Sequence, residues 1–172
     1  MLPPEALDVN NSLEELKLED IIKSIIKEGC IGETLAAIEA HYRQHLAQDH
    51  DVKGALKVIA EDETKHAKLA WDTVAWIAMK YPNYRNLIKS IFDQQLDKQQ
   101  HNLSKLASSP ATICPDNKKE EYFKRFGILA PSDQEKIGRF GMEKIIKPTY
   151  DAGIDQFSSI FDKIMSMNVN FI

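Results

Sequence analysis

Two long helical segments of this 172-residue chain each carry a glutamate within an apolar face. At about 100° per residue, Glu33 lies in the middle of a row of apolar and small residues, and Glu63 lies in a similar row. The two rows are Ile22, Ile26, Gly29, Ala37 and Ala40, and Leu56, Ile59, Ala67, Ala70, Val74 and Ile77. Because an ionised carboxylate is costly to bury without a partner, we expect a helical fold that compensates these two acids.

Each segment also carries a second apolar stripe, which predicts burial on two faces. These stripes are Ile31, Leu35, Ile38, Tyr42 and Leu46 on the first segment, and Val58, Leu69 and Trp76 on the second. Trp71 and Trp76 are both expected to anchor the core, and Cys30 is expected to be a small core residue. We therefore expect each long helix to lie between another helix and either the C-terminal helices or a second chain.

Capping and stop signals divide the chain into helices. The first helix begins at the capping box Ser12–Glu15 and runs to about His50. The second has Asp51 as its N-cap and ends before Pro82, which cannot continue a helix. The later predicted helices cover 84–106, 119–126, 132–147 and 150–166, with a loop over 107–117.

A second capping box, Ser132–Glu135, begins the helix over 132–147, and Pro148 is expected to kink or end it. The sequence contains no useful strand pattern and no internal repeat. We therefore predict a single all-α domain over 1–172, in which 12–81 form a pair of long helices and 83–172 add further helices.

The composition excludes several classes of protein. The net charge is −4, without the basic excess of a nucleic-acid binder. The chain has no apolar run long enough for membrane insertion and shows no secretory signal in its first residues. Its two cysteines, Cys30 and Cys114, lie far apart without a C-x-x-C pattern, so we expect neither a disulfide framework nor a thiolate zinc site. These features predict a cytoplasmic protein in a reducing compartment.

The motif that carries chemistry is Glu63-Thr64-Lys65-His66, a Glu-x-x-His pair. This spacing places both side chains on one helix face, one turn apart. The pair alone is common by chance on a solvated helix, but Glu33 in an apolar row of another helix favours a metal site. Carboxylate-bridged di-metal centres in helix bundles use single glutamates on two helices and Glu-x-x-His pairs on two others.

Residues 29–37 (GCIGETLAA) and 59–71 (IAEDETKHAKLAW) together resemble the ferritin-like di-iron superfamily, in particular a group of bacterial ferritin-like domain proteins. The resemblance runs from near Leu2 to about Trp76, with a weaker similarity over 126–148. It implies a ferritin-like helical bundle with Glu33 as a terminal carboxylate ligand, Glu63 as a bridging one and His66 as a terminal imidazole. The implied chemistry is iron binding with oxygen activation or ferrous oxidation, and manganese suits the same ligands.

The chain departs from that family in one respect. The full pattern includes an earlier helix pair with its own glutamate and a second Glu-x-x-His, and only His66 of the five histidines follows a glutamate by three. The chain therefore holds half of the expected ligand set. Other acids and histidines are expected to face solvent rather than complete the site. They are Asp93, Asp97 and His101 on one helix, and His41, His45 and Asp49 on another.

Two-fold symmetry offers a completion, because a homodimer combines four carboxylates and two imidazoles from Glu33, Glu63 and His66. Four negative charges would balance two Fe²⁺ ions per dimer. Two alternatives stay open. A heteromeric helical partner would supply the missing ligands, or the chain is a non-catalytic helical subunit that kept the fold and lost the metal.

Overall fold

The computed structural model describes residues 17–108, 122–123 and 125–165. Within these ranges every regular element is a helix, which confirms the predicted all-α class. The elements are α1 (Leu18–Ser24), the π-helical η1 (Ile25–Glu33), α2 (Thr34–Leu46), α3 (His50–Lys80), the 3₁₀ turn η2 (Pro82–Tyr84), α4 (Arg85–Ser108), α6 (Pro131–Phe140), the π-helical η3 (Gly141–Ile146), α7 (Lys147–Asp151), the 3₁₀ segment η4 (Ile154–Ser159) and α8 (Ile160–Met165). No helix of the described ranges is long and apolar enough to cross a membrane.

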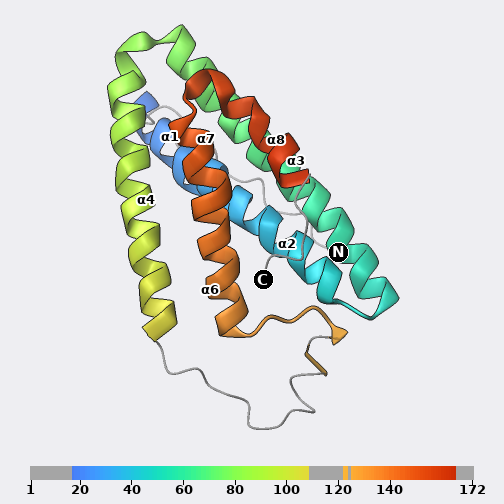
Figure 1. The fold of residues 1–172 in the computed structure, drawn as a ribbon. Coiled ribbons are helices and arrows are strands. Elements are labelled where there is room, and N and C mark those ends of the chain that lie inside the picture. Colours follow the sequence, from blue (N-terminus) through green and yellow to red (C-terminus); the bar gives the residue numbers. More distant parts are fainter. Residues whose placement is uncertain (1–16, 109–121, 124, 166–172) are drawn as a thin grey trace, which may run out of the picture.

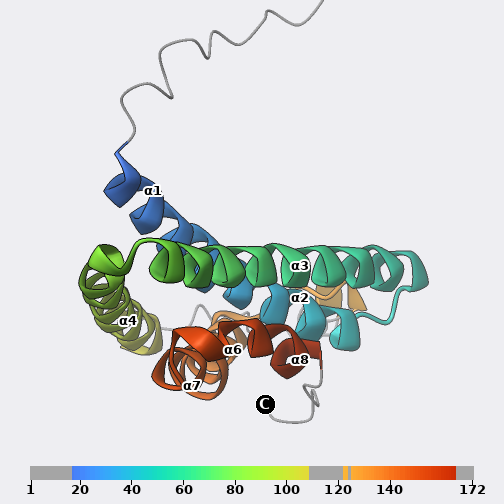
Figure 2. The same ribbon diagram turned by 90° about the horizontal axis from the view of Figure 1, so that it is seen from above.

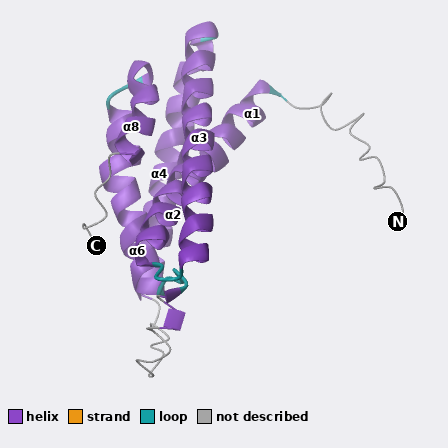
Figure 3. Cartoon of the chain, turned by 90° about the vertical axis from the view of Figure 1, so that its right-hand side faces the viewer, coloured by secondary structure: helices purple, strands orange, loops and turns teal. Residues whose placement is uncertain are grey.

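The long helix α3 has a covered side and an uncovered side. α1, η1 and α2 follow one another along the chain, and α2 packs along α3 (Figure 1). Viewed from above, α2, α4, α6, α7 and α8 lie on the same side of α3 (Figure 2). α1 leans away from the other helices (Figure 3). The fold therefore buries one face of α3 and leaves another face open.

The covered face of α3 packs around Trp71, which is fully buried. Its indole stacks on Phe92 of α4 with ring centroids 5.2 Å apart, and it meets Phe157 of η4 edge-on at 4.7 Å. The indole Nε1 donates to Thr34 Oγ1 at 3.1 Å, and this hydroxyl donates to the Cys30 carbonyl at 2.7 Å. Trp71 and Cys30 are thus core residues, as predicted, and the polar atoms beside them are paired, as burial requires.

The uncovered face of α3 contradicts the prediction of a second core stripe. Val58 and Leu69 are each 66% exposed, and Trp76 is 54% exposed. The apolar residues do form a stripe, but the described helices pack on the other side of α3, so this stripe stays in contact with solvent. The prediction that Trp76 anchors the core is therefore wrong for the single chain.

Two of the predicted helix starts are wrong. Asp49, not Asp51, caps α3, because its Oδ1 accepts hydrogen bonds from the backbone N–H groups of Asp51 and Val52, both at 3.1 Å. The capping box predicted at Ser132 does not form, since α6 begins at Pro131 and has no side-chain cap. Proline is favoured in the first helical turn, where its missing N–H leaves no hydrogen bond unmade.

Two of the predicted helices also differ from expectation. The first continues without a break from Leu18 to Leu46 but changes to π-helical geometry in η1, and the one predicted over 150–166 is divided at Gly153, whose φ of 92° suits glycine. Pro148 does not end its helix, because the π-helical η3 precedes it and α7 continues to Asp151. The predicted start at Ser12–Glu15 and most of 107–126 lie outside the described residues.

Candidate metal centre

Glu33, Glu63 and His66 meet between η1 and α3. One ligand atom of each residue lies within 4.8 Å of those of the other two. Glu33 is the last residue of η1, whereas Glu63 and His66 lie one turn apart on α3. The structure therefore brings together the three residues that the sequence predicted as ligands, while their role as ligands remains a prediction.

Small residues allow η1 and α3 to approach closely beside this cluster. A Cβ atom added to Gly29 would lie 2.5 Å from the Cβ atom of Ala70, well inside van der Waals contact. The crossing therefore tolerates no side chain at position 29 unless a backbone moves. The glycine sets the distance between the helix that carries Glu33 and the helix that carries Glu63.

The π-helical η1 changes where Glu33 lies relative to the core. Along this stretch, one row of buried residues recurs every four positions, at Ile22, Ile26, Cys30 and Thr34, and Ile31 is buried beside it. A π-helix has a wider turn than an α-helix, so the regular 100° step does not hold across Ile25–Glu33. Glu33 is therefore half-buried beside the apolar row, not in the middle of it as predicted.

Glu63 is likewise half-buried, with 28% of its side chain exposed. Its predicted neighbour Ile59 is 47% exposed, whereas Ala60, Thr64 and Ala67 are fully buried. The centre of the buried face thus lies to one side of Glu63. Both glutamates border the core and also reach solvent, so a partner or an ion can approach them from outside.

The two carboxyl groups perturb each other electrostatically. A side-chain hydrogen bond with Glu63, desolvation and the charge of Glu63 raise the pKa of Glu33 to about 7, against a lowering influence of His66. At pH 7 the Glu33 carboxyl is therefore roughly half protonated. A cation that displaced this proton would remove the repulsion between the two acids.

One oxygen of the cluster lacks a hydrogen-bond partner among the described residues. Glu63 Oε2 is buried, and the His66 Nδ1 atom lies 3.6 Å from it, too far for a hydrogen bond. Buried polar atoms without partners are rare in native structures and call for a missing group. Two carboxylates and an imidazole are donors that suit Fe²⁺ and Mn²⁺, so the residues fit such a metal.

A largely apolar cavity of about 320 Å³ adjoins the cluster between η1 and α3. Glu33 and His66 line it together with Leu69, Ala70 and Thr73 of α3 and residues of η1. Sequence reasoning missed this cavity, because it predicted these helix faces to be buried. The half-exposed His66 and the cavity open the cluster to small molecules from the uncovered side of α3.

The other acids and histidines considered from the sequence do not join the cluster. Asp93, Asp97, His101 and His45 are exposed, as predicted. His41 departs from the prediction of a solvated face: it is half-buried, burial lowers its pKa, and its buried Nε2 has no partner in the described part of the chain. Within those same ranges, Glu33, Glu63 and His66 form the one group with the proximity that a metal ion requires.

Comparisons with known proteins leave the family open, since no protein-family model, no curated protein and no solved structure matches this chain. The ferritin-like resemblance therefore rests on residues 29–37 and 59–71 and remains a prediction. The geometry of Glu33, Glu63 and His66 supports metal binding independently of any family.

Proposed function

We propose that this chain is a ferritin-like protein that binds a di-iron centre, or its manganese equivalent, through Glu33, Glu63 and His66. The centre is shared across a homodimer and serves oxidase or ferroxidase chemistry with O₂. The observation that carries the proposal is the meeting of two coupled carboxyls and an imidazole around an unpartnered Glu63 oxygen. Iron, when bound, would supply the change between Fe²⁺ and Fe³⁺ that such oxidation requires.

The three residues have different tasks in this proposal. Glu33 exchanges its proton for the cation, so metal affinity falls as the pH drops below its pKa of about 7. Glu63 lies one turn from His66 on α3, and by the ferritin-like resemblance it would be the bridging carboxylate. His66 has its side chain 54% exposed and would hold the metal through an imidazole nitrogen from the open side of α3.

The stripe that supports a second copy as the partner is a row on the uncovered face of α3 that shares Leu69 and Trp76, but not Val58, with the predicted stripe. It consists of Ile59, Asp62, His66, Leu69, Thr73 and Trp76. Successive residues of this row are 3, 4, 3, 4 and 3 positions apart, so the row has the same spacing when it is followed from either end. Two antiparallel copies of α3 would therefore place Ile59 opposite the partner's Trp76, Asp62 opposite the partner's Thr73, and His66 opposite the partner's Leu69. Such self-complementarity is what a two-fold interface requires.

The same symmetry brings the two half-sites near each other. The midpoint of the stripe falls between Ala67 and Lys68, about 2 Å along the helix axis from His66 and about 7 Å from Glu63. A two-fold axis through this midpoint would bring the ligands of both chains to its vicinity. Burial of Leu69 and Trp76 would stabilise the dimer through the apolar area removed from water.

The proposal is tested by metal analysis of the purified full chain after anaerobic loading with Fe²⁺. We expect about one iron per chain in the wild type, almost none in Glu63→Gln, and the wild-type content in the control Glu61→Gln, whose carboxylate lies 3.9 Å from the Lys57 amine and outside both the cluster and the stripe. A chain that takes up iron only with another polypeptide would establish the heteromeric alternative. A folded chain that takes up neither iron nor manganese would show that it is a non-catalytic subunit.

A further inference from the structure

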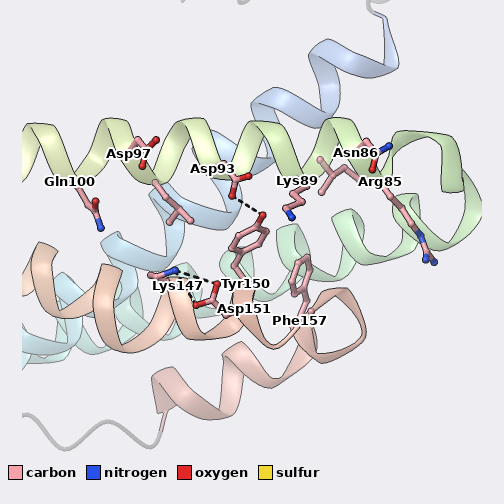
Figure 4. Close-up of a pocket in the computed structure, with 13 residues that line it drawn as sticks. Arg85, Asn86, Lys89, Asp93, Asp97, Gln100, Lys147, Tyr150, Asp151 and Phe157 are labelled. Atoms are coloured by element: carbon pink, nitrogen blue, oxygen red, sulfur yellow. Dashed lines mark hydrogen bonds and ion pairs between the residues drawn. The ribbon is translucent and has the colours of Figure 1, made fainter.

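A second cavity, remote from the metal cluster, lies between α4 and the segment formed by α7 and η4 (Figure 4). Its volume is about 900 Å³, within the range of sites for small organic ligands. Apolar surface comes from Tyr150, which is partly exposed and stacks on Phe92 at 4.9 Å, whereas Ile88 and Phe157 line the wall but are almost fully buried. The metal proposal makes no use of this cavity.

The α4 wall carries charges in an unusual order. Arg85, Lys89, Asp93 and Asp97 follow at intervals of four residues and all line the cavity. Two cations therefore lie at the N-terminal end of α4 and two acids lie further along. The helix dipole favours acids in the first turn, where α4 has none, and the order Lys then Asp is the weaker ion-pair orientation. The stability of α4 itself therefore does not explain this order.

At both the cationic and the acidic end of this α4 row, a charged side chain is available to bind a ligand. Lys89 makes no hydrogen bond or ion pair with any residue of the described ranges, and its nitrogen points from α4 into the cavity, toward the wall that Tyr150 and Phe157 line (Figure 4). The Asp93 carboxylate accepts a hydrogen bond from the Tyr150 hydroxyl at 2.9 Å, which holds it in place. Asp97, one turn further along α4, has no protein partner within the same ranges.

We propose that this cavity binds a zwitterion of dipeptide size, with its carboxylate at Lys89, its ammonium group at Asp93 and Asp97, and an apolar side chain against the ring of Tyr150. Lys89 and Asp93 are separated by about 6 Å along the helix axis. An extended dipeptide spans about 7 Å, so its two charged ends match this separation. A cavity with cations alone would instead select a simple anion.

The test uses the full chain in a chelator, so that its outcome does not depend on the metal centre. Binding of Ala-Phe is measured by calorimetry beside N-acetyl-Ala-Phe, which lacks the ammonium group, and Ala-Phe amide, which lacks the carboxylate. We expect each modification to weaken binding at least about tenfold, since each removes a charged hydrogen-bond partner.

Variants assign each end of the ligand. Lys89→Gln is expected to weaken Ala-Phe by about tenfold but to leave Ala-Phe amide within about twofold. Asp97→Asn should weaken Ala-Phe and spare N-acetyl-Ala-Phe. The control Lys98→Gln removes an exposed charge of α4 outside the cavity and should change nothing. Equal binding of all three probes, no saturable binding up to about 10 mM, or an equal loss in Lys98→Gln would overturn the proposal.

Discussion

The two faces of α3 differ in how far their side chains are buried and hydrogen-bonded within the chain. On one face, Trp71 is fully buried, its indole N–H is hydrogen-bonded to Thr34, and aromatic rings from α4 and η4 cover it. On the other face, Leu69 is exposed, and at the border between the two faces a buried oxygen of Glu63 has no partner among the described residues. The same helix thus has a buried, hydrogen-bonded core on one side and, beside it, a cluster of polar groups that lacks a partner among the described residues.

This difference separates the interactions that hold the fold from the residues for which we propose a metal and a partner. On the covered face, the indole N–H of Trp71 has an acceptor and its ring packs on other aromatic rings. These interactions stabilise the single chain. The open face combines apolar side chains with two repelling carboxyls, which is unfavourable for an isolated chain in water. Changes on the covered face should therefore alter folding, and changes on the open face should alter association and metal binding.

The largest effect is expected from Trp71→Ala on the covered face. Loss of a fully buried indole leaves a cavity, so the free energy of unfolding should fall by about 3–5 kcal/mol. Urea denaturation of the metal-free chain measures this change. Trp71→Phe keeps a ring and loses the hydrogen bond to Thr34, so it should cost clearly less. If both variants unfold at the wild-type urea concentration, the covered face is not the core.

Leu69→Lys should break association through the open face while leaving folding nearly unchanged. A charge at the midpoint of a two-fold stripe should weaken the dimer by at least about 100-fold, or about 2.7 kcal/mol. Analytical ultracentrifugation measures this loss. Met79→Lys is the matched control, because Met79 is 57% exposed on the same helix and lies outside the stripe. Equal effects of both substitutions would argue against the stripe as the interface.

Gly29→Ala tests the helix crossing that links the two faces. The new Cβ atom would lie 2.5 Å from that of Ala70, so we expect a loss of about 1–3 kcal/mol and a wider separation of Glu33 from Glu63. The double variant with Ala70→Gly should recover both stability and metal content. Gly54→Ala serves as the control, since its Cβ would meet no atom within 4 Å. Failure of Ala70→Gly to rescue the variant would contradict close packing at this point.

Glu33→Gln should produce the smallest of these effects, and it should stabilise the folded chain. The pKa of Glu33 in the folded chain is raised above its ordinary value of 4.5 to about 7, so its contribution to stability is present below pH 4.5 and is lost as the pH rises through 7. The metal-free variant should therefore gain roughly 1 kcal/mol at pH 8, a modest figure because solvent screens the site. Thermal unfolding in a chelator between pH 4.5 and 8 measures it, and an unchanged pH profile would contradict the coupling.

Much of the fold followed from local sequence signals. The stop before Pro82, the long helices and the buried Trp71 were all predicted, because proline and apolar spacing act over a few residues. The cap at Asp49 was missed, since Asp51 offers the same side chain two residues later. The π-helical η1 was missed because its hydrogen bonds leave no compositional signal, and this shifted Glu33 to the edge of the core row.

The three residues of the candidate site were predicted from the sequence, but the exposure of the helix face beside them was not. Spacing alone placed Glu63 and His66 on one face, and the structure brings Glu33 to them. Spacing does not reveal which apolar stripe the chain covers, because that depends on where distant helices pack. Leu69 and Trp76 were therefore assigned to the core, although their exposure is the main indication of a partner.

The central claim, a metal site shared between two copies, is tested most directly by native mass spectrometry of the full chain during anaerobic titration with Fe²⁺. We expect the metal-loaded species to be a dimer that carries two iron ions, with Glu63→Gln remaining without iron across the same titration. A monomer that binds iron fully without forming the dimer, or a dimer that gains no iron, would contradict the shared centre.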